Sequence, residues 1–297
     1  MLTYDALFAA NAAAFLFSAL LVFSVRLPSP GPSERERGVW HNLSFGIRTY
    51  LKTPRLRGLL ALSLAVATAG AMVIVNTVVY VRDRFGGTES DTALAFAAAG
   101  AGSMVVALML PRFLDRVADR PLMLGGGIIL TAGLLLGWTD PGLHALLPIW
   151  FVLGAGASLI QTPAGRLLRR SAQDGDRPAI YAAQFALSHA CWLVAYLFAG
   201  WIGSTLGLTA AFTVFAVVTL VSTVAALALW PAHDPGDLEH LHEESEHEHP
   251  HFHDEHHQHV HEGWEGPEPH RHPHLHAQMK HKHAYVIDLH HPVWPSQ

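Results

Sequence analysis

The chain has 297 residues, of which 51% are hydrophobic and 14% are charged, and its formal charge at pH 7 is −5. Soluble domains carry about 25% charged residues, so this composition excludes an ordinary soluble protein. The single cysteine, Cys191, excludes an internal disulfide framework. Residues 231–297 hold 19 of the 22 histidines, and their 13 acidic residues against 3 basic ones give −10, whereas residues 1–230 carry +5.

Seven stretches within the first 230 residues are apolar and long enough to cross a bilayer, which takes about 20 residues at helical rise. None of them contains Asp, Glu, Lys or Arg, and a protein of this size has no interior to hide seven such helices. We therefore expect an all-α integral membrane protein with seven transmembrane helices, at 6–25, 58–81, 93–110, 122–138, 143–162, 179–202 and 207–230.

The same pattern predicts four segments. A first transmembrane helix (1–25) precedes a linker (26–57), a six-helix transmembrane bundle (58–230) and a polar tail (231–297). Within the linker, Trp40, Leu43, Ile47 and Tyr50 recur at helical spacing, which predicts a short helix lying in the membrane interface. A plain connecting helix is the alternative that we favour for this segment.

Loop charge predicts the orientation. Arginines and lysines concentrate in 26–57 and 111–121 and again in 163–178, whereas the alternate connections have almost no excess of positive charge. By the positive-inside rule, the basic loops and the tail lie in the cytoplasm, so we expect a multi-pass protein of the inner (plasma) membrane with a cytoplasmic C-terminus. Seven spans then place Met1 outside, and the chain opens as if within a longer protein.

The loop at 111–120, with the sequence PRFLDRVADR, resembles the G-x-x-x-D-R-x-G-R-R signature of the major facilitator superfamily of secondary transporters. Asp115, Arg116 and Arg120 fit the signature, while other residues replace its two glycines and one of its basic residues. The resemblance implies that 6–230 corresponds to the sixth through twelfth helices of that fold. It also implies a missing N-terminal half, so the chain is expected to be a fragment, a mis-started gene model or one member of a split pair.

The same resemblance assigns a gating role to the charged loop. Asp115 and Arg116 are expected to form a cytoplasmic latch, because a carboxylate that faces a helix N-terminus in only one conformation biases a two-state equilibrium. The alternative is that these residues, with Arg120, are solvated charges that anchor the loop on the cytoplasmic side.

Polar residues inside the spans are few, and any ionisable one at mid-membrane is a candidate functional group. We single out His189, which is able to relay a proton or to ligate a metal through its neutral imidazole, together with Asn76, Gln184 and Cys191. The alternatives are a histidine hydrogen-bonded between helices and a cysteine that acts as a small buried hydrophobe.

The tail repeats the pattern H-x-H and interleaves it with Glu and Asp. Many imidazoles with carboxylates and no thiols favour borderline divalent ions such as Ni²⁺, Co²⁺ or Zn²⁺, and no fixed tetrahedral spacing is visible, so we expect a capacious metal buffer. A pH-sensing or merely solubilising segment is the alternative. Low hydrophobicity predicts a tail that is disordered without metal. The expected ligands are His240, His242, His247, His249, His251, His253, His256, His257, His259, His261, His270, His272, His274, His276, His281 and His283.

Together, the bundle and the tail resemble the bacterial nickel-resistance exporters of the superfamily. This resemblance implies efflux of nickel, cobalt or zinc, with the tail gathering cytosolic metal and with the lipid bilayer and the metal ions as partners. No cofactor, no nucleic acid and no enzymatic activity is expected, since no nucleophile and base, phosphate loop or metal-hydrolase spacing occurs. Two alternatives stay open: an exporter of an organic molecule, such as a drug or siderophore, with a regulatory tail, and a non-transporting metal sensor or store.

Overall fold

The computed structural model describes residues 3–25, 38–234, 237–242, 245–251, 270–276, 279–287 and 294. The chain divides into two compact units, Met1–Pro32 and Ser33–Gln297. In the first unit, α1 (Tyr4–Ser24) begins after Thr3, whose hydroxyl accepts a hydrogen bond from the Ala6 amide at 3.3 Å. Beyond Asp5 in its first turn, this helix is predominantly apolar, and none of its residues is buried.

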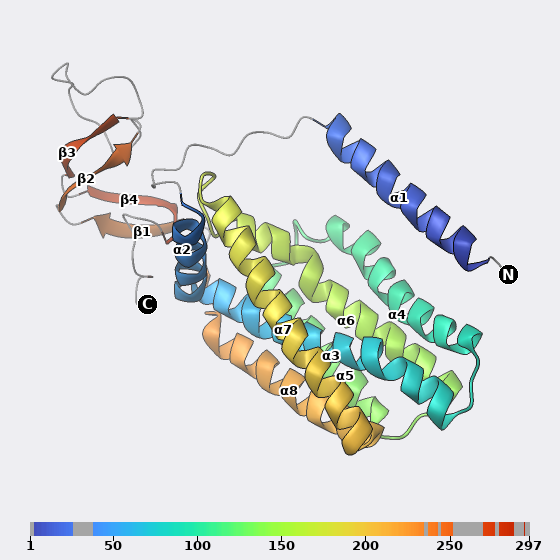
Figure 1. The fold of residues 1–297 in the computed structure, drawn as a ribbon. Coiled ribbons are helices and arrows are strands. Elements are labelled where there is room, and N and C mark those ends of the chain that lie inside the picture. Colours follow the sequence, from blue (N-terminus) through green and yellow to red (C-terminus); the bar gives the residue numbers. More distant parts are fainter. Residues whose placement is uncertain are drawn as a thin grey trace. The chain divides into compact units, whose positions relative to one another are not determined.

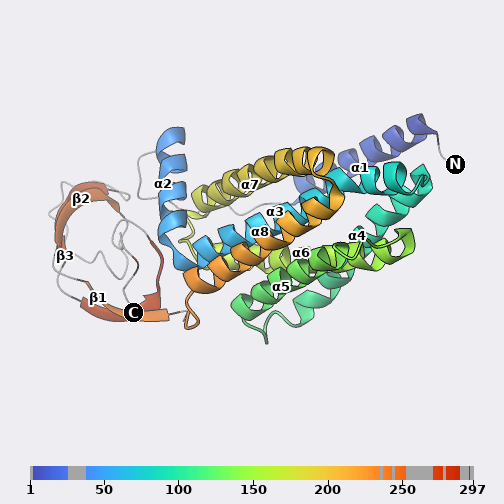
Figure 2. The same cartoon turned by 90° about the horizontal axis from the view of Figure 1, so that it is seen from below.

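The second unit contains α2 (Val39–Lys52) and a bundle of six long helices (Figure 1). Helix α3 packs against α5, α6, α7 and α8, and α4 packs mainly against α6, while α2 crosses one end of the bundle beside α7 (Figure 2). The bundle helices are α3 (Pro54–Val78, continued by a π-helical turn at Val79–Arg84), α4 (Glu89–Met109, continued by a 3₁₀ turn at Leu110–Arg112), α5 (Asp119–Gly137), α6 (Leu143–Arg169), α7 (Arg177–Thr205) and α8 (Leu208–Leu229).

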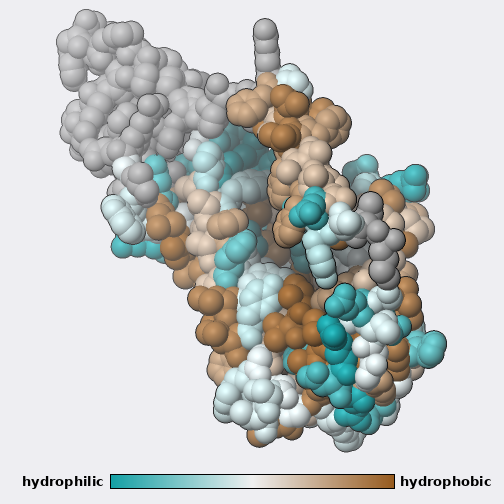
Figure 3. Space-filling view, turned by 45° about the vertical axis from the view of Figure 1, so that its right-hand side comes forward, coloured by the Kyte–Doolittle hydropathy of each residue, from teal (hydrophilic) through white to brown (hydrophobic). Residues whose placement is uncertain are grey.

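Seven of the helices in the described part of the chain, α1 and α3 to α8, have the length and apolar composition of membrane spans. Large apolar side chains, among them Phe185, Leu197 and Trp201 on α7, are exposed, and Figure 3 shows broad apolar areas on the surface. Such surface suits contact with lipid rather than water. The predicted all-α membrane fold is thus confirmed, and the chain is a multi-pass membrane protein.

Small residues bring α4 and α6 into close contact. A Cβ added to Gly102 on α4 would meet the backbone of Phe151, and one added to Gly154 on α6 would meet the backbone of Ala99. In lipid, where apolar burial gives little drive for association, this close backbone approach maximises van der Waals contact. These two glycines therefore serve helix packing.

The structure describes four short strands in the tail. They form two antiparallel pairs: β1 (Asp237–His242) with β4 (Met279–Ala284), and β2 (Ser245–His251) with β3 (His270–His276). Low hydrophobicity does exclude a packed core, but a two-stranded ladder needs only backbone hydrogen bonds. The structure thus describes strands in parts of the tail, and the expected disorder of the tail without metal stays a prediction.

Candidate functional site

A charged network lies where α5 begins and α6 ends, at the end of the bundle with the basic loops. Asp119, the first residue of α5, is buried, and its Oδ1 accepts a hydrogen bond from Nε of Arg166 at 3.0 Å. The Arg166 guanidinium also donates to the backbone carbonyl of Leu114. This contact exists because α6 continues beyond the predicted end of its span at residue 162, through Pro163, to Arg169.

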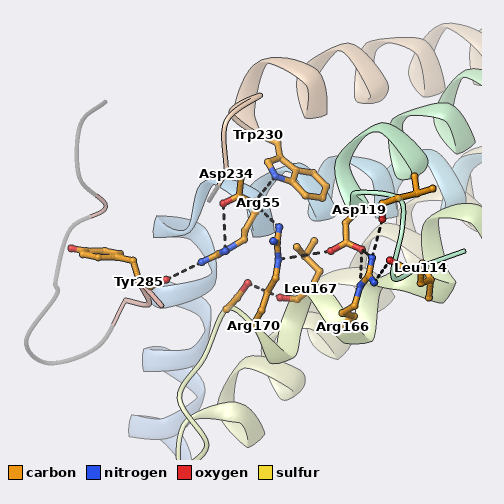
Figure 4. A network of polar contacts seen from close by, with 11 residues as sticks. Arg55, Leu114, Asp119, Arg166, Leu167, Arg170, Trp230, Asp234 and Tyr285 are labelled. Carbon is orange, nitrogen blue, oxygen red and sulfur yellow. Dashed lines mark hydrogen bonds and ion pairs between the residues drawn. The ribbon is translucent and has the colours of Figure 1, made fainter. Parts of the chain in front are cut away.

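The network extends to the start of the tail (Figure 4). Nη2 of Arg170 lies 2.6 Å from Oδ2 of Asp234, while its Nε lies 3.8 Å from Oδ2 of Asp119. Trp230, just after α8, donates from its indole Nε1 to the same Asp234 oxygen at 3.0 Å. Arg55, the second residue of α3, completes the chain of ion pairs at 3.4 Å from Asp234. Three arginines and two aspartates thus join α3, α5, α6 and the tail.

A cavity of about 660 Å³ lies beside this network. It is lined by residues of the 114–121 loop together with Arg166, Arg170, Trp230 and Asp234. Arg120, one of its lining residues, donates to the backbone carbonyl of Trp230 at 2.8 Å and to that of Leu227 at 3.0 Å. The start of α5 is thereby tied to the end of α8.

The predicted latch residues lie on the wall of this cavity. Asp115 and Arg116 are exposed there, and the ion pairs of the network are formed by Asp119, four residues further on. The gating role of Asp115 and Arg116 stays a prediction. Sequence analysis missed the network itself, whose members are Arg55, Asp119, Arg166, Arg170 and Asp234. The sequence did contain one signal, since an acidic residue begins α5 and several basic residues lie at the end of α6.

A second cavity, of about 250 Å³, lies among α3, α6 and α7 inside the bundle. The structure brings two of the predicted residues together here, Gln184 and His189, and adds polar groups that the prediction did not include. The lining residues are Leu59, Ser63, Val66, Ile160, Gln161, Ala164, Gln184, Ser188, His189 and Trp192. The cavity is thus a partly open apolar pocket with a few hydrogen-bonding groups, the usual composition of a small-ligand site.

His189 offers a ring nitrogen to a ligand in this cavity. Its Nδ1 lies 2.8 Å from the carbonyl oxygen of Phe185, and the two rings stack with centroids 3.9 Å apart. A carbonyl only accepts, so Nδ1 carries the proton, and in the neutral imidazole Nε2 keeps a lone pair. That lone pair is able to accept a proton or to ligate a metal ion. The hydrogen bond between His189 and Phe185 lies within α7. It therefore differs from the hydrogen bond between helices that we considered as the alternative.

Gln184 connects the cavity to α2. The buried hydroxyl of Tyr50 donates to Oε1 of Gln184, and Nε2 of Gln184 donates to Oγ of Ser63 at 3.4 Å. Burial raises the pKa of Tyr50 above its ordinary value, with a smaller contribution from Cys191, so the hydroxyl stays a protonated donor at neutral pH. Helix α2 is confirmed as a helix, and through Tyr50 it positions a cavity side chain as well as connecting two segments.

The other two predicted intramembrane residues lie outside the lining of this cavity. Asn76 is buried on α3, and its Nδ2 donates to the carbonyl of Ala199 on α7 at 3.4 Å, which joins the two helices. Cys191 is a half-buried free thiol that packs against the apolar core. The reading of this cysteine as a small hydrophobe fits its surroundings.

Those predicted ligands of the tail that the structure describes lie on the four strands. The register places His240 opposite His281, and His249 opposite His272, while the described side chains of the bundle form no group of three metal-ligating residues. Metal binding by the tail stays a prediction. The predicted ligands His253, His256, His257, His259 and His261 lie outside the described residues.

These features define a class of protein: a multi-pass membrane protein with an apolar cavity, bearing a few hydrogen-bonding groups, between its helices and an ion network at one end. The sequence profile of the Major Facilitator Superfamily matches residues 60–266. This match covers more than half of the chain, so the chain belongs to the major facilitator superfamily, whose members are membrane transporters. A comparison with curated proteins found no match.

Proposed function

We propose that this transporter exports divalent transition-metal ions, namely nickel, cobalt or zinc, and that its tail gathers them on the cytoplasmic side of the plasma membrane. The observation that carries the proposal is His189, an imidazole in a bundle cavity whose Nδ1 is held by Phe185 and whose Nε2 is left for a ligand. Neutral imidazole is a preferred ligand of these three ions. The metal is cargo here, and no resident cofactor is required.

The tail supports the same cargo. It holds 19 of the 22 histidines, and it follows directly on α8, beside the ion network at the end with the basic loops. A dense group of weak ligands at this end of the bundle raises the local concentration of ions there. The companion N-terminal half implied by the family resemblance stays a prediction.

Metal tolerance of cells that express the protein tests the proposal. In the tail variant, glutamine replaces the sixteen histidines predicted as ligands while Asp234 and Tyr285 are kept, so the ion network is undisturbed. We expect this variant and His189→Asn to lower tolerance to nickel. His144→Asn, an exposed histidine of α6 outside the cavity, is the matched control and should leave tolerance unchanged. Equal nickel tolerance in all of these strains would refute metal export.

An organic cargo is the second candidate, because Trp192, Val66 and Ile160 give the same cavity apolar walls. The same strains separate the two classes when their tolerance to toxic organic compounds is measured. Loss of tolerance to such compounds in His189→Asn, with nickel tolerance retained, would favour the organic exporter. If neither metal ions nor organic compounds are transported, the non-transporting metal sensor or store is the remaining candidate.

A further inference from the structure

Arg55 holds both ends of the histidine-rich segment. This arginine is only 2% exposed, although it lies at the start of a helix beside the polar tail. Its Nη1 lies 3.4 Å from Oδ1 of Asp234, and its Nη2 donates to the backbone carbonyl of Tyr285 at 2.8 Å. The first partner precedes the strands β1 to β4, and the second follows them. One guanidinium therefore joins the two ends of the segment.

The second end is anchored by more than this one hydrogen bond. Tyr285, Val286 and Ile287 are buried, each with no more than 6% of its surface exposed. The Arg55 guanidinium stands over the Trp294 ring at 4.9 Å, and the Tyr285 and Trp294 rings pack edge to face at 5.2 Å. An arginine over an aromatic face is stabilised by the ring quadrupole, most strongly where water is excluded. A short apolar segment thus docks around a buried cation.

The same arginine belongs to the ion network of the bundle. Asp234 is shared between Arg55 and Arg170, and Arg170 continues the network to Asp119 on α5. A buried guanidinium needs hydrogen-bond acceptors, and for Arg55 one of the two comes from the tail's far end. Docking of the tail segment at Tyr285 and ordering of the ion network therefore stabilise each other.

We propose that Arg55 is a clasp that closes the histidine-rich segment into a loop against this end of the bundle, and that its docking partner is the tail's own segment at Tyr285–Ile287 and Trp294. Closure keeps the histidines of strands β1 to β4 within a loop's reach of the network, which raises their effective concentration there. The closure does not depend on the cargo. Its value for supplying metal rests on the proposed function.

Hydrogen–deuterium exchange of the full chain in detergent, with a chelator present, tests the clasp. We expect peptides that contain 285–287 to exchange at least ~10-fold more slowly than an unstructured chain, because the segment is docked. Arg55→Gln should remove most of that protection. Arg57→Gln removes the same charge from an exposed position two residues away and should have no effect.

Trp294→Ala provides the second variant, since it changes only the tail and keeps the test valid even where Arg55→Gln fails to fold. It too should speed exchange at 285–287. Unprotected amides in the wild type, or protection that survives both variants, would overturn the clasp. Nickel efflux by the wild type separates the two proposals: protected amides without any efflux would uphold the clasp and refute metal export, whereas efflux without protection would do the opposite.

Discussion

Asp119 is the carboxylate on which the ion network depends. It is buried, and it pairs with Arg166 and Arg170, both of which are about one-third exposed on their side chains. Removal of the charge from a buried carboxylate leaves its partner arginines without a counter-charge. The resulting loss of folding free energy is larger than the loss from an exposed ion pair. The residue therefore matters for stability whether or not it takes part in gating.

Asp119→Asn should destabilise the protein by about 1–3 kcal/mol, the range for a lost charge-assisted hydrogen bond. The midpoint of thermal unfolding in detergent measures this effect. Asp115→Asn makes the same chemical change four residues earlier at an exposed position and should fall within about 0.5 kcal/mol of the wild type. Equal destabilisation by both substitutions would contradict the network as described.

The sequence predicted the right loop but not the residues that pair. Residues 111–120 were singled out by their resemblance to a family signature, and a signature does not say which carboxylate faces a partner. That depends on where α5 begins, at Asp119, and on how far α6 runs, to Arg169. Asp234 was beyond prediction for a different reason, since it lies in the tail, where hydrophobic periodicity gives no guidance.

Helix α2 shows how an element can be predicted while its role is not. The spacing of Trp40, Leu43, Ile47 and Tyr50 predicted the helix, but only packing reveals that Trp40 is 82% exposed whereas Tyr50 is 0% exposed and bonded to Gln184. The seven spans were predictable because length and apolarity are properties of the sequence itself. Long-range side-chain contacts are not.

Tyr50→Phe should destabilise the protein by about 1 kcal/mol through loss of the hydrogen bond to Gln184. Because burial raises the pKa of Tyr50, the folded protein keeps its phenolic proton above pH 10, where an unfolded chain loses it, so stability falls as pH rises above that value. Thermal unfolding between pH 7 and 11 measures both effects. Tyr181→Phe removes an exposed hydroxyl bonded to the Gly165 carbonyl and is the control. A pH response that is identical in wild type and Tyr50→Phe would contradict this environment.

The contact between α4 and α6 makes a second prediction for an element. Gly154→Ala places a methyl group against the backbone of Ala99, so the helices must separate, at a cost of about 1–3 kcal/mol. Gly100→Ala, on α4, adds the same group where nothing lies within 4 Å, and the better helix propensity of alanine should make it neutral or slightly stabilising. The midpoint of thermal unfolding should therefore fall for Gly154→Ala and stay unchanged or rise slightly for Gly100→Ala. Equal shifts would rule out close packing at Gly154.

At the scale of the whole molecule, an apolar bundle and an imidazole-rich tail meet at one ion network. Metal binding by such a tail must compete with protons, because only neutral imidazole ligates. Nickel affinity of the full chain should therefore weaken as pH falls through the histidine pKa of about 6.5. Calorimetric titration at pH 6 and pH 8 measures the difference. Affinity that is independent of pH would exclude the histidines as ligands.

Nickel flux into inside-out membrane vesicles, driven by an imposed proton gradient, separates metal export from the alternatives. We expect uptake above that of vesicles without the protein, abolished by His189→Asn and kept by His144→Asn. The tail variant should lose uptake at low nickel concentration and recover it at high concentration, because in the proposed function the tail supplies ions to the cavity. Metal export would be contradicted if nickel uptake equalled that of vesicles without the protein while the same chain transported an organic compound.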